Sequence, residues 1–402
     1  MERILDQFYP PLEQREPVSQ LFLPASTAAI VFGYTFGPGL MQTFFVAAVL
    51  LALFFARPYY TDGSVVTDYT MSSGFVVSLL SFLDLGTSAE GGPRYVGPPG
   101  KPLPRPVGKR DLKTWWQKFK WSLGMATTPR GIGWDWQVKN VPAHPDGNLP
   151  RFHFVATRVV EVVWRSALKA LAVYCIGFSR TVQPTVTSPL ASWLLSAVIG
   201  WCGAVWSWNT IGVAHAAGAV ITVAIGLCEP WEWPPVFDAL EKAWSVRQVW
   251  STTYHQILRQ PLQQPGIRLA RFLGLKKGTF GSRYLQLYLA FFLSFSVHWW
   301  QAYNVARGDR GEFAFFMSQP VIITIEDFLQ WVWHKSVSAK RRESLALLEY
   351  RVGYVWTIAA FTMTLIPVMR GWTGMGLIGS SGPDEVMALR LGQQHGAAYL
   401  SG

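Results

Sequence analysis

A run of 48 consecutive residues, from Thr181 to Cys228, contains no Asp, Glu, Lys or Arg. Three further windows, residues 40–56, 284–306 and 352–369, are also free of these residues. A helix needs about 20 apolar residues to cross the hydrocarbon core of a bilayer, so the windows predict transmembrane helices. Only 15% of the chain is charged, against roughly 25% in soluble globular proteins. A soluble enzyme is therefore excluded.

The windows predict an all-α fold, a polytopic membrane helical bundle with about eight transmembrane helices. We expect residues 1–402 to form a single membrane-embedded domain, and Asn209 to be the turn of a two-span hairpin within the 48-residue run. The predicted spans are residues 21–36, 40–56, 64–83, 189–206, 209–228, 284–304, 313–332 and 352–369.

Residues 154–178 differ from these spans because they carry charges. Arg158, Glu161, Arg165 and Lys169 recur at steps of three and four residues, which places them on one stripe of a helix. We interpret this segment as an interfacial helix or as a polar-faced helix inside the bundle, and not as an ordinary lipid-facing span.

The net charge is +11, from 35 Lys and Arg against 24 Asp and Glu. The basic residues lie between the apolar spans, in residues 86–157, 229–283 and 335–351, which is typical of membrane-protein loops that favour the cytoplasm and anionic lipid. No nucleic-acid partner is therefore expected. The prediction is a multi-pass integral membrane protein, located in the endoplasmic reticulum, with the lipid bilayer as a partner; the sequence leaves its oligomeric state open.

The segments between the spans differ in composition. Residues 86–108 are rich in Gly and Pro and predict a linker, and residues 111–123 interleave Lys with Trp and Phe and predict a helix in the headgroup region. Together they belong to a long polar and amphipathic loop, residues 86–157. Residues 229–283 are a basic loop, and residues 371–402 a C-terminal tail. Three cysteines in apolar surroundings provide neither a disulfide framework nor a CxxC metal site, so no metal is expected.

No Walker loop, dinucleotide fingerprint, HExxH or GxSxG motif is present, so polar residues at membrane depth are the informative feature. His298 lies near the middle of the charge-free residues 284–306, with Ser294 and Gln301 about one helical turn away. An imidazole, whose ordinary pKa is about 6.5, can be neutral at working pH and accept a proton. His298 could be a general base, or a structural histidine between helices, and its spacing does not decide between the two.

A second polar segment, residues 250–260, precedes the basic part of its loop. Helical spacing would place Ser251, His255 and Arg259 on one face. His255 could orient a catalytic group and Arg259 could contact a phosphate. A solvated interfacial helix is the favoured alternative.

A third polar place is Glu326–Asp327, directly after a β-branched apolar run. One carboxylate could hydrogen-bond an imidazole or a substrate hydroxyl. The slightly favoured interpretation is that this pair of carboxylates only marks the edge of the membrane. No Ser or Cys has an activating base that the sequence reveals, so a covalent acyl-enzyme is not supported.

Five segments together resemble the wax-synthase-like branch of the membrane-bound O-acyltransferases, in particular its fungal terpenoid and meroterpenoid acetyltransferases. The segments are RGIGWDWQVKN at 130–140, EWPPVF at 232–237, AWSVRQVW at 243–250, YHQILR at 254–259 and SFSVH at 294–298. The resemblance spans roughly residues 125–335.

Several positions depart from the patterns of that branch. Asp135 replaces Asn, Tyr254 stands where Trp is usual, and the membrane motif around His298 lacks its Gly. The resemblance favours the catalytic interpretation of His298 over the structural one.

The resemblance implies transfer of an acyl group, acetyl above all, from coenzyme A to an alcohol. His298 would accept the hydroxyl proton and His255 would steady the developing charge or align the donor. On charge and location, Arg259, Lys276 and Lys277 are candidates to bind the phosphates of the coenzyme. Acetyl-CoA would be a substrate and not a tightly bound cofactor, and the acceptor a lipophilic alcohol that enters from the lipid.

Three alternatives remain open. A long-chain wax ester synthase would use the same residues with another donor. A polytopic transporter would also place His and acidic residues in the membrane, but no inverted repeat is visible. A catalytically silent relative acting as a scaffold is disfavoured by the intact pair of histidines.

Overall fold

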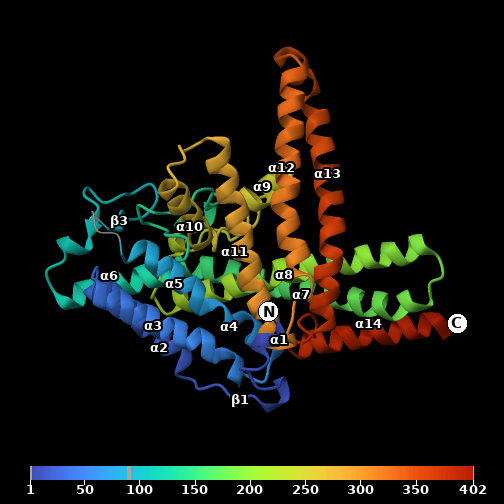
Figure 1. Ribbon diagram of the computed structural model, residues 1–402, viewed down its shortest axis with the longest axis horizontal. Helices are drawn as coiled ribbons and strands as arrows, with labels where there is room; N and C mark the ends of the chain where they lie inside the picture. The colour runs from blue at the N-terminus through green and yellow to red at the C-terminus, as the bar shows by residue number, and fades with distance from the viewer. Residues whose placement is uncertain (1, 88–91, 402) are drawn as a thin grey trace. The chain divides into compact units, whose positions relative to one another are not determined.

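Helices account for most of the chain in the computed structural model, which describes residues 2–87 and 92–401 (Figure 1). Among the described residues the α-helices are α1 (Glu2–Leu5), α2 (Phe22–Phe36), α3 (Leu40–Ala56), α4 (Val65–Ser72), α5 (Gly74–Leu85), α6 (Trp115–Thr127), α7 (Arg151–Val182), α8 (Pro189–Ala224), α9 (Val246–Gln248), α10 (Arg259–Phe272), α11 (Phe280–Ala306), α12 (Glu312–Ser336), α13 (Ala339–Gly374) and α14 (Pro383–Ser401). The expected all-α class is confirmed.

Short elements connect these helices. β1 (Glu16–Pro17) pairs in parallel with β2 (Tyr60–Thr61), and β3 (Arg94–Tyr95) pairs antiparallel with β4 (Val107–Gly108). Single turns of 3₁₀-helix are η1 (Leu12–Gln14), η2 (Arg57–Tyr59), η3 (Lys109–Asp111), η4 (Pro145–Asn148), η5 (Gln183–Thr185), η6 (Pro230–Glu232) and η7 (Leu240–Lys242), and η8 (Val249–Thr253) is a π-helix.

By length and composition, four stretches of helix in the described chain could cross a membrane: Leu40–Tyr59, Val65–Leu85, Pro189–Ala224 and Ala339–Gly374. Phe22–Phe36 is a shorter apolar helix. In α3 only Val46 and Leu50 are buried, and Leu40 and Phe44 are 91% and 77% exposed. So much exposed apolar surface indicates contact with lipid. The protein is therefore a helical membrane protein, but these stretches do not confirm about eight crossings.

The predicted hairpin in the 48-residue run is wrong, because α8 is one continuous helix of 36 residues. Asn209, the expected turn, is buried in its middle, where the side chain donates to the carbonyl of Val205 at 2.8 Å. A polar side chain that bonds the carbonyl one turn back can remain within a helix instead of ending it. At 1.5 Å per residue α8 is about 54 Å long, well beyond the thickness of a hydrocarbon core.

The charges of residues 154–178 lie on one helix, α7, and are paired. Arg165 donates to Glu161 at 2.8 Å and to Asn209 of α8 at 3.4 Å. Lys169 forms an ion pair of 2.9 Å with Glu385 of α14, which is fully buried. Of the two predicted interpretations, the structure therefore supports the polar-faced helix packed inside a bundle.

The chain divides into two compact units. The first unit comprises Met1–Val141 and Gln256–Gly308, and the second comprises Pro142–His255 and Asp309–Gly402. Whether both belong to a single domain, as predicted, stays a prediction. The core of the first unit collects side chains from α2, α3, α5 and α6 and from the loop after α6: Tyr34, Val46, Leu50, Phe75, Leu79, Phe82, Leu85, Met125 and Trp134.

In the second unit α7 packs against both α8 and α14. Glycines allow the close approach of α14: a Cβ on Gly392 would lie 2.2 Å from the Tyr174 carbonyl, and one on Gly177 would lie 2.5 Å from the Leu389 carbonyl. Small residues at a helix contact let the backbones touch in this way. The predicted tail 371–402 thus includes the end of α13 and the packed helix α14.

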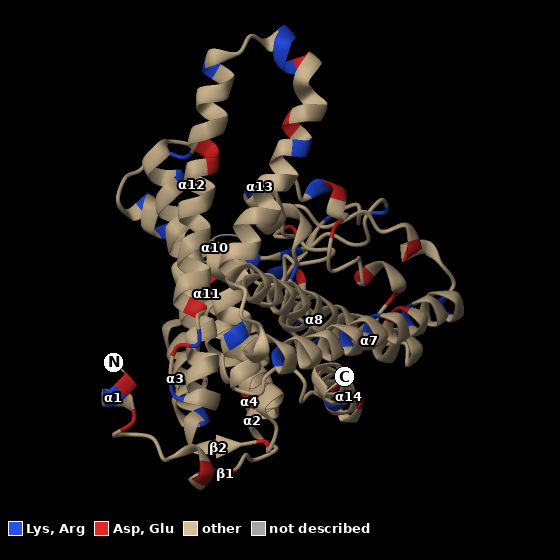
Figure 2. Ribbon diagram, turned by 90° about the vertical axis from the view of Figure 1, so that its right-hand side faces the viewer, with Lys and Arg blue, Asp and Glu red and all other residues tan. Residues whose placement is uncertain are grey.

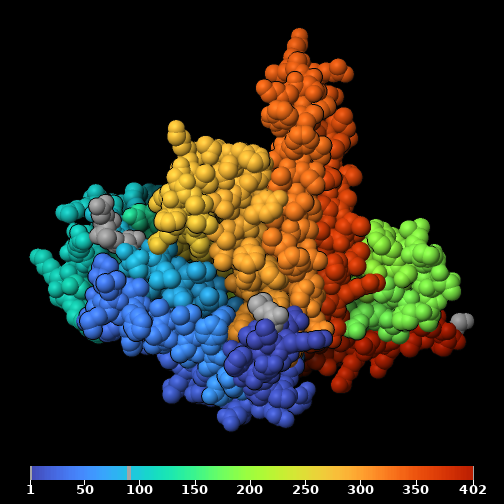
Figure 3. Space-filling view, viewed as in Figure 1, coloured from blue at the N-terminus to red at the C-terminus, as the bar shows by residue number. Residues whose placement is uncertain are grey.

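The predicted basic loop at 335–351 is also helical for most of its length. α12 and α13 form a hairpin whose turn is confined to Val337 and Ser338. They lie side by side as a continuous surface (Figure 3), and the Trp333 indole donates to Glu349 at 2.6 Å. Basic residues are concentrated at the tip (Figure 2). Within the predicted loop 86–157, residues 111–123 include most of α6, and residues 88–91 of the linker lie outside the described residues.

Candidate active site

His298 lies on α11 in the first unit and is half-buried. Its Nδ1 is 3.0 Å from the hydroxyl oxygen of Tyr69, on α4, and the two atoms share a hydrogen bond. Gln301, predicted one turn away, is 8% exposed, and its Oε1 has no hydrogen-bond partner among the described residues. The histidine is thus held by a buried phenol from a distant part of the sequence.

Tyr69 was not among the residues that the sequence singles out. It occurs in the helix VVTDYTMS, where nothing in spacing or composition connects it with a histidine 229 residues later. The only local signal was Asp68, an acidic residue inside a predicted span, which by default suggests function.

His255 lies in the second unit among aromatic rings. Its ring centroid is 4.5 Å from that of Tyr254 and 6.4 Å from that of Phe237. Trp208 of α8 stacks on Phe237 with a centroid distance of 3.8 Å. These rings restrict the orientation of the imidazole. The EWPPVF segment contributes Phe237, so two of the recognised segments meet at His255.

The expected helical face of Ser251, His255 and Arg259 does not exist. The π-helix η8 ends at Thr253, Tyr254 is extended, and α10 begins only at Arg259. The π-helix does not run on into α10, because Tyr254 between them is extended. Helical spacing therefore does not apply to this segment.

Arg259 begins α10 in the first unit and is half-buried. Its Nη1 donates to Gln256 Oε1 at 2.7 Å and to the carbonyl of Lys139 at 3.4 Å. Burial lowers the pKa of the Arg259 guanidinium, which nevertheless stays charged because its ordinary value is so high. Arg259 is therefore placed beside the end of the RGIGWDWQVKN segment.

Lys276 and Lys277 lie in the loop after α10 and are exposed. Arg259 is at the opposite end of this 14-residue helix, about 20 Å away along its axis at 1.5 Å per residue. The structure therefore does not bring the three predicted coenzyme contacts together in one cluster.

The RGIGWDWQVKN segment is a compact loop. Gly131 and Gly133 have φ values of +65° and +80°, and a Cβ on Gly131 would lie 2.7 Å from the Trp136 ring. Only glycine adopts this conformation readily, which accounts for both glycines of the motif. Arg130 is 4% exposed, and burial lowers the pKa of its guanidinium to about 10.

Glu326 and Asp327 on α12 hold the AWSVRQVW segment. Glu326 accepts hydrogen bonds from the backbone N–H groups of Val246 (2.9 Å) and Arg247 (3.0 Å), at the start of α9. Asp327 accepts from the Arg247 guanidinium at 2.9 Å. The carboxylates therefore anchor the segment that leads to His255. Seven residues earlier on α12, Gln319 accepts from the Trp250 indole at 3.1 Å.

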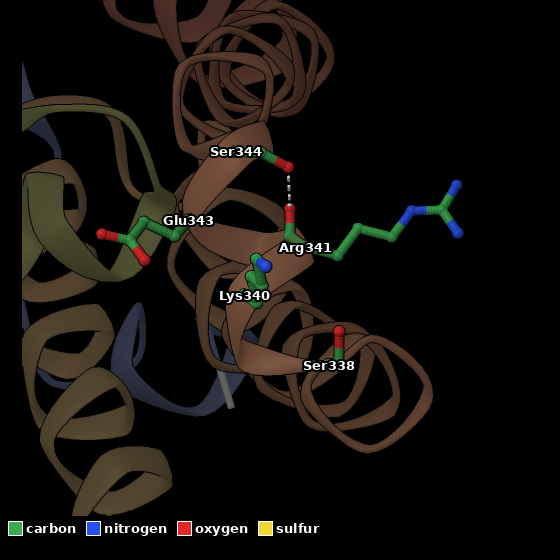
Figure 4. A pocket seen from close by; sticks show the side chains of 5 residues that line it. All are labelled: Ser338, Lys340, Arg341, Glu343 and Ser344. Atoms are coloured by element: carbon green, nitrogen blue, oxygen red, sulfur yellow. Dashed lines mark hydrogen bonds between the residues drawn. The ribbon is translucent and has the colours of Figure 1, made fainter.

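Two cavities contain no histidine among their lining residues. One, at the tip of the α12–α13 hairpin, is lined by Ser338, Lys340, Arg341, Glu343 and Ser344 (Figure 4). The other is a groove of about 600 Å³ between α2 and α6, lined by apolar residues and threonines and rimmed by Trp115 and Phe119. Neither lining contains His298 or His255, the two predicted catalytic histidines.

The fold and these residues define a helical membrane protein with a tyrosine-bound histidine in a long helix. The model of the "Membrane bound O-acyl transferase family" matches residues 233–318. That range includes His255, Arg259 and His298, so the resemblance predicted from the sequence segments is confirmed.

Fungal proteins are similar to the chain over a longer range. Acetyltransferase ple2 of Rhodocybe pseudopiperita is 30% identical over 257 residues, 61% of this chain and 64% of that protein. Acetyltransferase sirH of Leptosphaeria maculans is 31% identical over 278 residues, 64% of each chain. O-Mevalon transferase macI of Penicillium terrestre is 29% identical over 236 residues, 54% of each. The chain thus covers less than two thirds of the length of these relatives. No solved structure matches the chain.

Proposed function

We propose that the protein is an O-acyltransferase that moves an acetyl group from acetyl-CoA to a hydroxyl group of an apolar secondary metabolite, a terpenoid or meroterpenoid. The observation that carries the proposal is His298, half-buried on α11 within the family match and hydrogen-bonded to Tyr69. The names of ple2 and sirH support acetyl as the transferred group. The apolar helices support a membrane location, and we propose the endoplasmic reticulum with a multi-pass topology.

In the proposed reaction the acceptor oxygen attacks the thioester carbonyl while His298 takes the hydroxyl proton. The new C–O bond forms, the C–S bond breaks, and the proton passes to the departing thiolate of coenzyme A. A thioester is an activated acyl donor, so one base and good positioning suffice. No tightly bound cofactor enters this scheme.

The other predicted residues have supporting roles in the proposal. His255, restrained by Tyr254 and Phe237, would align the donor or stabilise the developing negative charge. Arg259 would contact a phosphate of the coenzyme. Lys276 and Lys277 remain proposed contacts at the exposed end of α10, separate from Arg259.

The experiment measures acyl transfer by the full chain in membrane vesicles supplied with acetyl-CoA and a hydroxylated terpenoid, following both free coenzyme A and the acetylated product. His298→Gln keeps a hydrogen-bonding side chain but cannot act as a base, and we expect its rate to fall by roughly 10²- to 10⁴-fold. His153→Gln, at an exposed position of α7, is the matched control and should be unchanged.

Near-normal transfer by well-accumulated His298→Gln would remove the base from the proposal. Palmitoyl-CoA, added as a competing donor, tests the acyl group: preferential transfer of palmitate would replace the acetyltransferase by a wax ester synthase. Uptake of the terpenoid into vesicles without release of coenzyme A would instead indicate a transporter.

A further inference from the structure

We infer that Tyr69 is a positioning residue for His298. An ion-pair network around Asp68 holds Tyr69 in place. This inference rests on the proposed function. The direct contact is the 3.0 Å hydrogen bond between the Tyr69 hydroxyl and His298 Nδ1. Tyr69 is 5% exposed, so water does not compete strongly for its hydroxyl. The N-terminal part of the chain, outside residues 233–318, thereby contributes a group to the site.

The hydrogen bond matters because the two ring nitrogens of a histidine have different tasks. For Nε2 to accept a proton from an alcohol, the neutral ring must carry its own proton on Nδ1. The Tyr69 oxygen then accepts the Nδ1–H hydrogen bond and fixes both the tautomer and the angle of the ring. When Nε2 takes the proton of the acceptor, the same oxygen stabilises the imidazolium that forms.

Asp68, the residue before Tyr69, is the centre of the supporting network. It is 2% exposed and accepts from Arg57 at 2.9 Å, from the Thr61 hydroxyl at 2.6 Å and from the backbone N–H of Asp62 at 2.7 Å. It also forms an ion pair of 3.0 Å with Arg15. A carboxylate with this many donors cannot turn without breaking several of them.

Arg15 extends this network to the helix that carries His298. Its second terminal nitrogen donates to the backbone carbonyl of Asn304 on α11 at 3.1 Å. Arg15 therefore connects α4, through Asp68, with α11, less than two turns beyond His298. The Tyr69 hydrogen bond fixes the orientation of the imidazole, and the Arg15 contacts fix the distance between α4 and α11. Supporting groups keep a catalytic side chain in productive geometry in this way.

The test compares Tyr69→Phe with the wild type in the same vesicle assay, at equal amounts of folded protein. Phe keeps the ring and removes only the hydroxyl. We expect kcat to fall about 10- to 100-fold, the range found for residues that orient the histidine ligands of metal sites, while KM for acetyl-CoA stays the same. The matched control is Tyr303→Phe: Tyr303 is fully buried on α11 and donates to Asp6 at 2.9 Å, and its kcat should be unchanged.

A merely structural role for Tyr69 would lower the amount of folded protein and leave kcat per folded molecule normal, which would overturn the inference. Adding Tyr69→Phe to His298→Gln should cause no further loss of rate, because the two residues act as a unit. A further loss as large as that caused by Tyr69→Phe alone would contradict this. If His298→Gln is inactive and Tyr69→Phe is normal, only the inference about Tyr69 fails. If His298→Gln itself is active, the proposed function loses its base first.

A second variant keeps the test informative if Tyr69→Phe does not fold. Incorporation of 3-fluorotyrosine at position 69 preserves the ring and the hydroxyl, but makes the oxygen a weaker acceptor and the O–H a stronger donor. An accepting oxygen predicts that kcat falls relative to the wild type, and an unchanged kcat would contradict the positioning role. A rise in kcat would mean that Tyr69 donates to Nδ1, which would overturn the proposed tautomer.

Discussion

Single side chains show how differently the candidate residues are held. His298 is hydrogen-bonded to Tyr69 of α4, whereas Lys276 and Lys277 are exposed in a loop. Arg259 is intermediate, because one terminal nitrogen is shared between Gln256 and the Lys139 carbonyl. Both contacts come from Nη1, and a guanidinium, with five N–H donors in a planar fork, has the geometry that binds phosphate oxygens.

Arg259→Ala should therefore raise KM for acetyl-CoA about tenfold or more, since a hydrogen bond to a charged group is worth roughly 1.5–3 kcal/mol. The contact would act on substrate and transition state alike, so kcat should change little. Steady-state kinetics with varied acetyl-CoA measure this. Arg271→Ala, exposed near the other end of α10, is the control. An unchanged KM in Arg259→Ala would show that Arg259 does not bind the coenzyme.

Among the helices, α12 has a structural task that its sequence did not reveal. Gln319 and Glu326 are seven residues apart and therefore lie on one face. They bind the Trp250 indole and the start of α9, respectively. Ser245 completes this end of α9 by accepting the backbone N–H of Gln248 at 3.1 Å. Ser245, Arg247 and Trp250 of the AWSVRQVW segment are thus explained by how the segment is held.

Glu326→Gln should destabilise the protein by about 1–3 kcal/mol, because one buried backbone N–H loses its acceptor and faces an amide NH₂. Asp327→Asn is the matched control on the neighbouring residue. Its partner Arg247 is 37% exposed in its side chain, so we expect a loss of at most about 1 kcal/mol. Thermal unfolding in detergent compares the two variants. Equal stability of Glu326→Gln and the wild type would contradict the anchoring role.

For the whole molecule, the exposed apolar faces of helices such as α3 require a bilayer. We predict that the protein stays in the membrane pellet after alkaline carbonate washing, since burial of these faces in lipid does not depend on surface charge. A peripheral protein of the same vesicles should be released and serves as the control. Recovery of most of the chain in the supernatant would contradict the membrane assignment.

Properties that depend on local composition and periodicity could be predicted from the order of the amino acids alone. Charge-free windows predicted apolar helices, and steps of three and four predicted the polar stripe of α7, because both follow from the geometry of one helix. Short motifs predicted the family match, and His298 was singled out by its position in an apolar segment. A pattern read from neighbouring residues needs no knowledge of the fold.

Contacts between residues that are far apart in the sequence became known from the packing of the helices. Tyr69 and His298 are 229 residues apart, and Arg247 and Asp327 are 80 apart, so no local pattern connects them. The same reason explains the errors: Asn209 was expected to be a turn, but its side chain bonds the helix and Arg165 of α7. Ser251, His255 and Arg259 were expected on one helical face, but the chain becomes extended at Tyr254. Packing between helices, and not the propensity of each segment, settles where a helix continues and which side chains surround a reactive group.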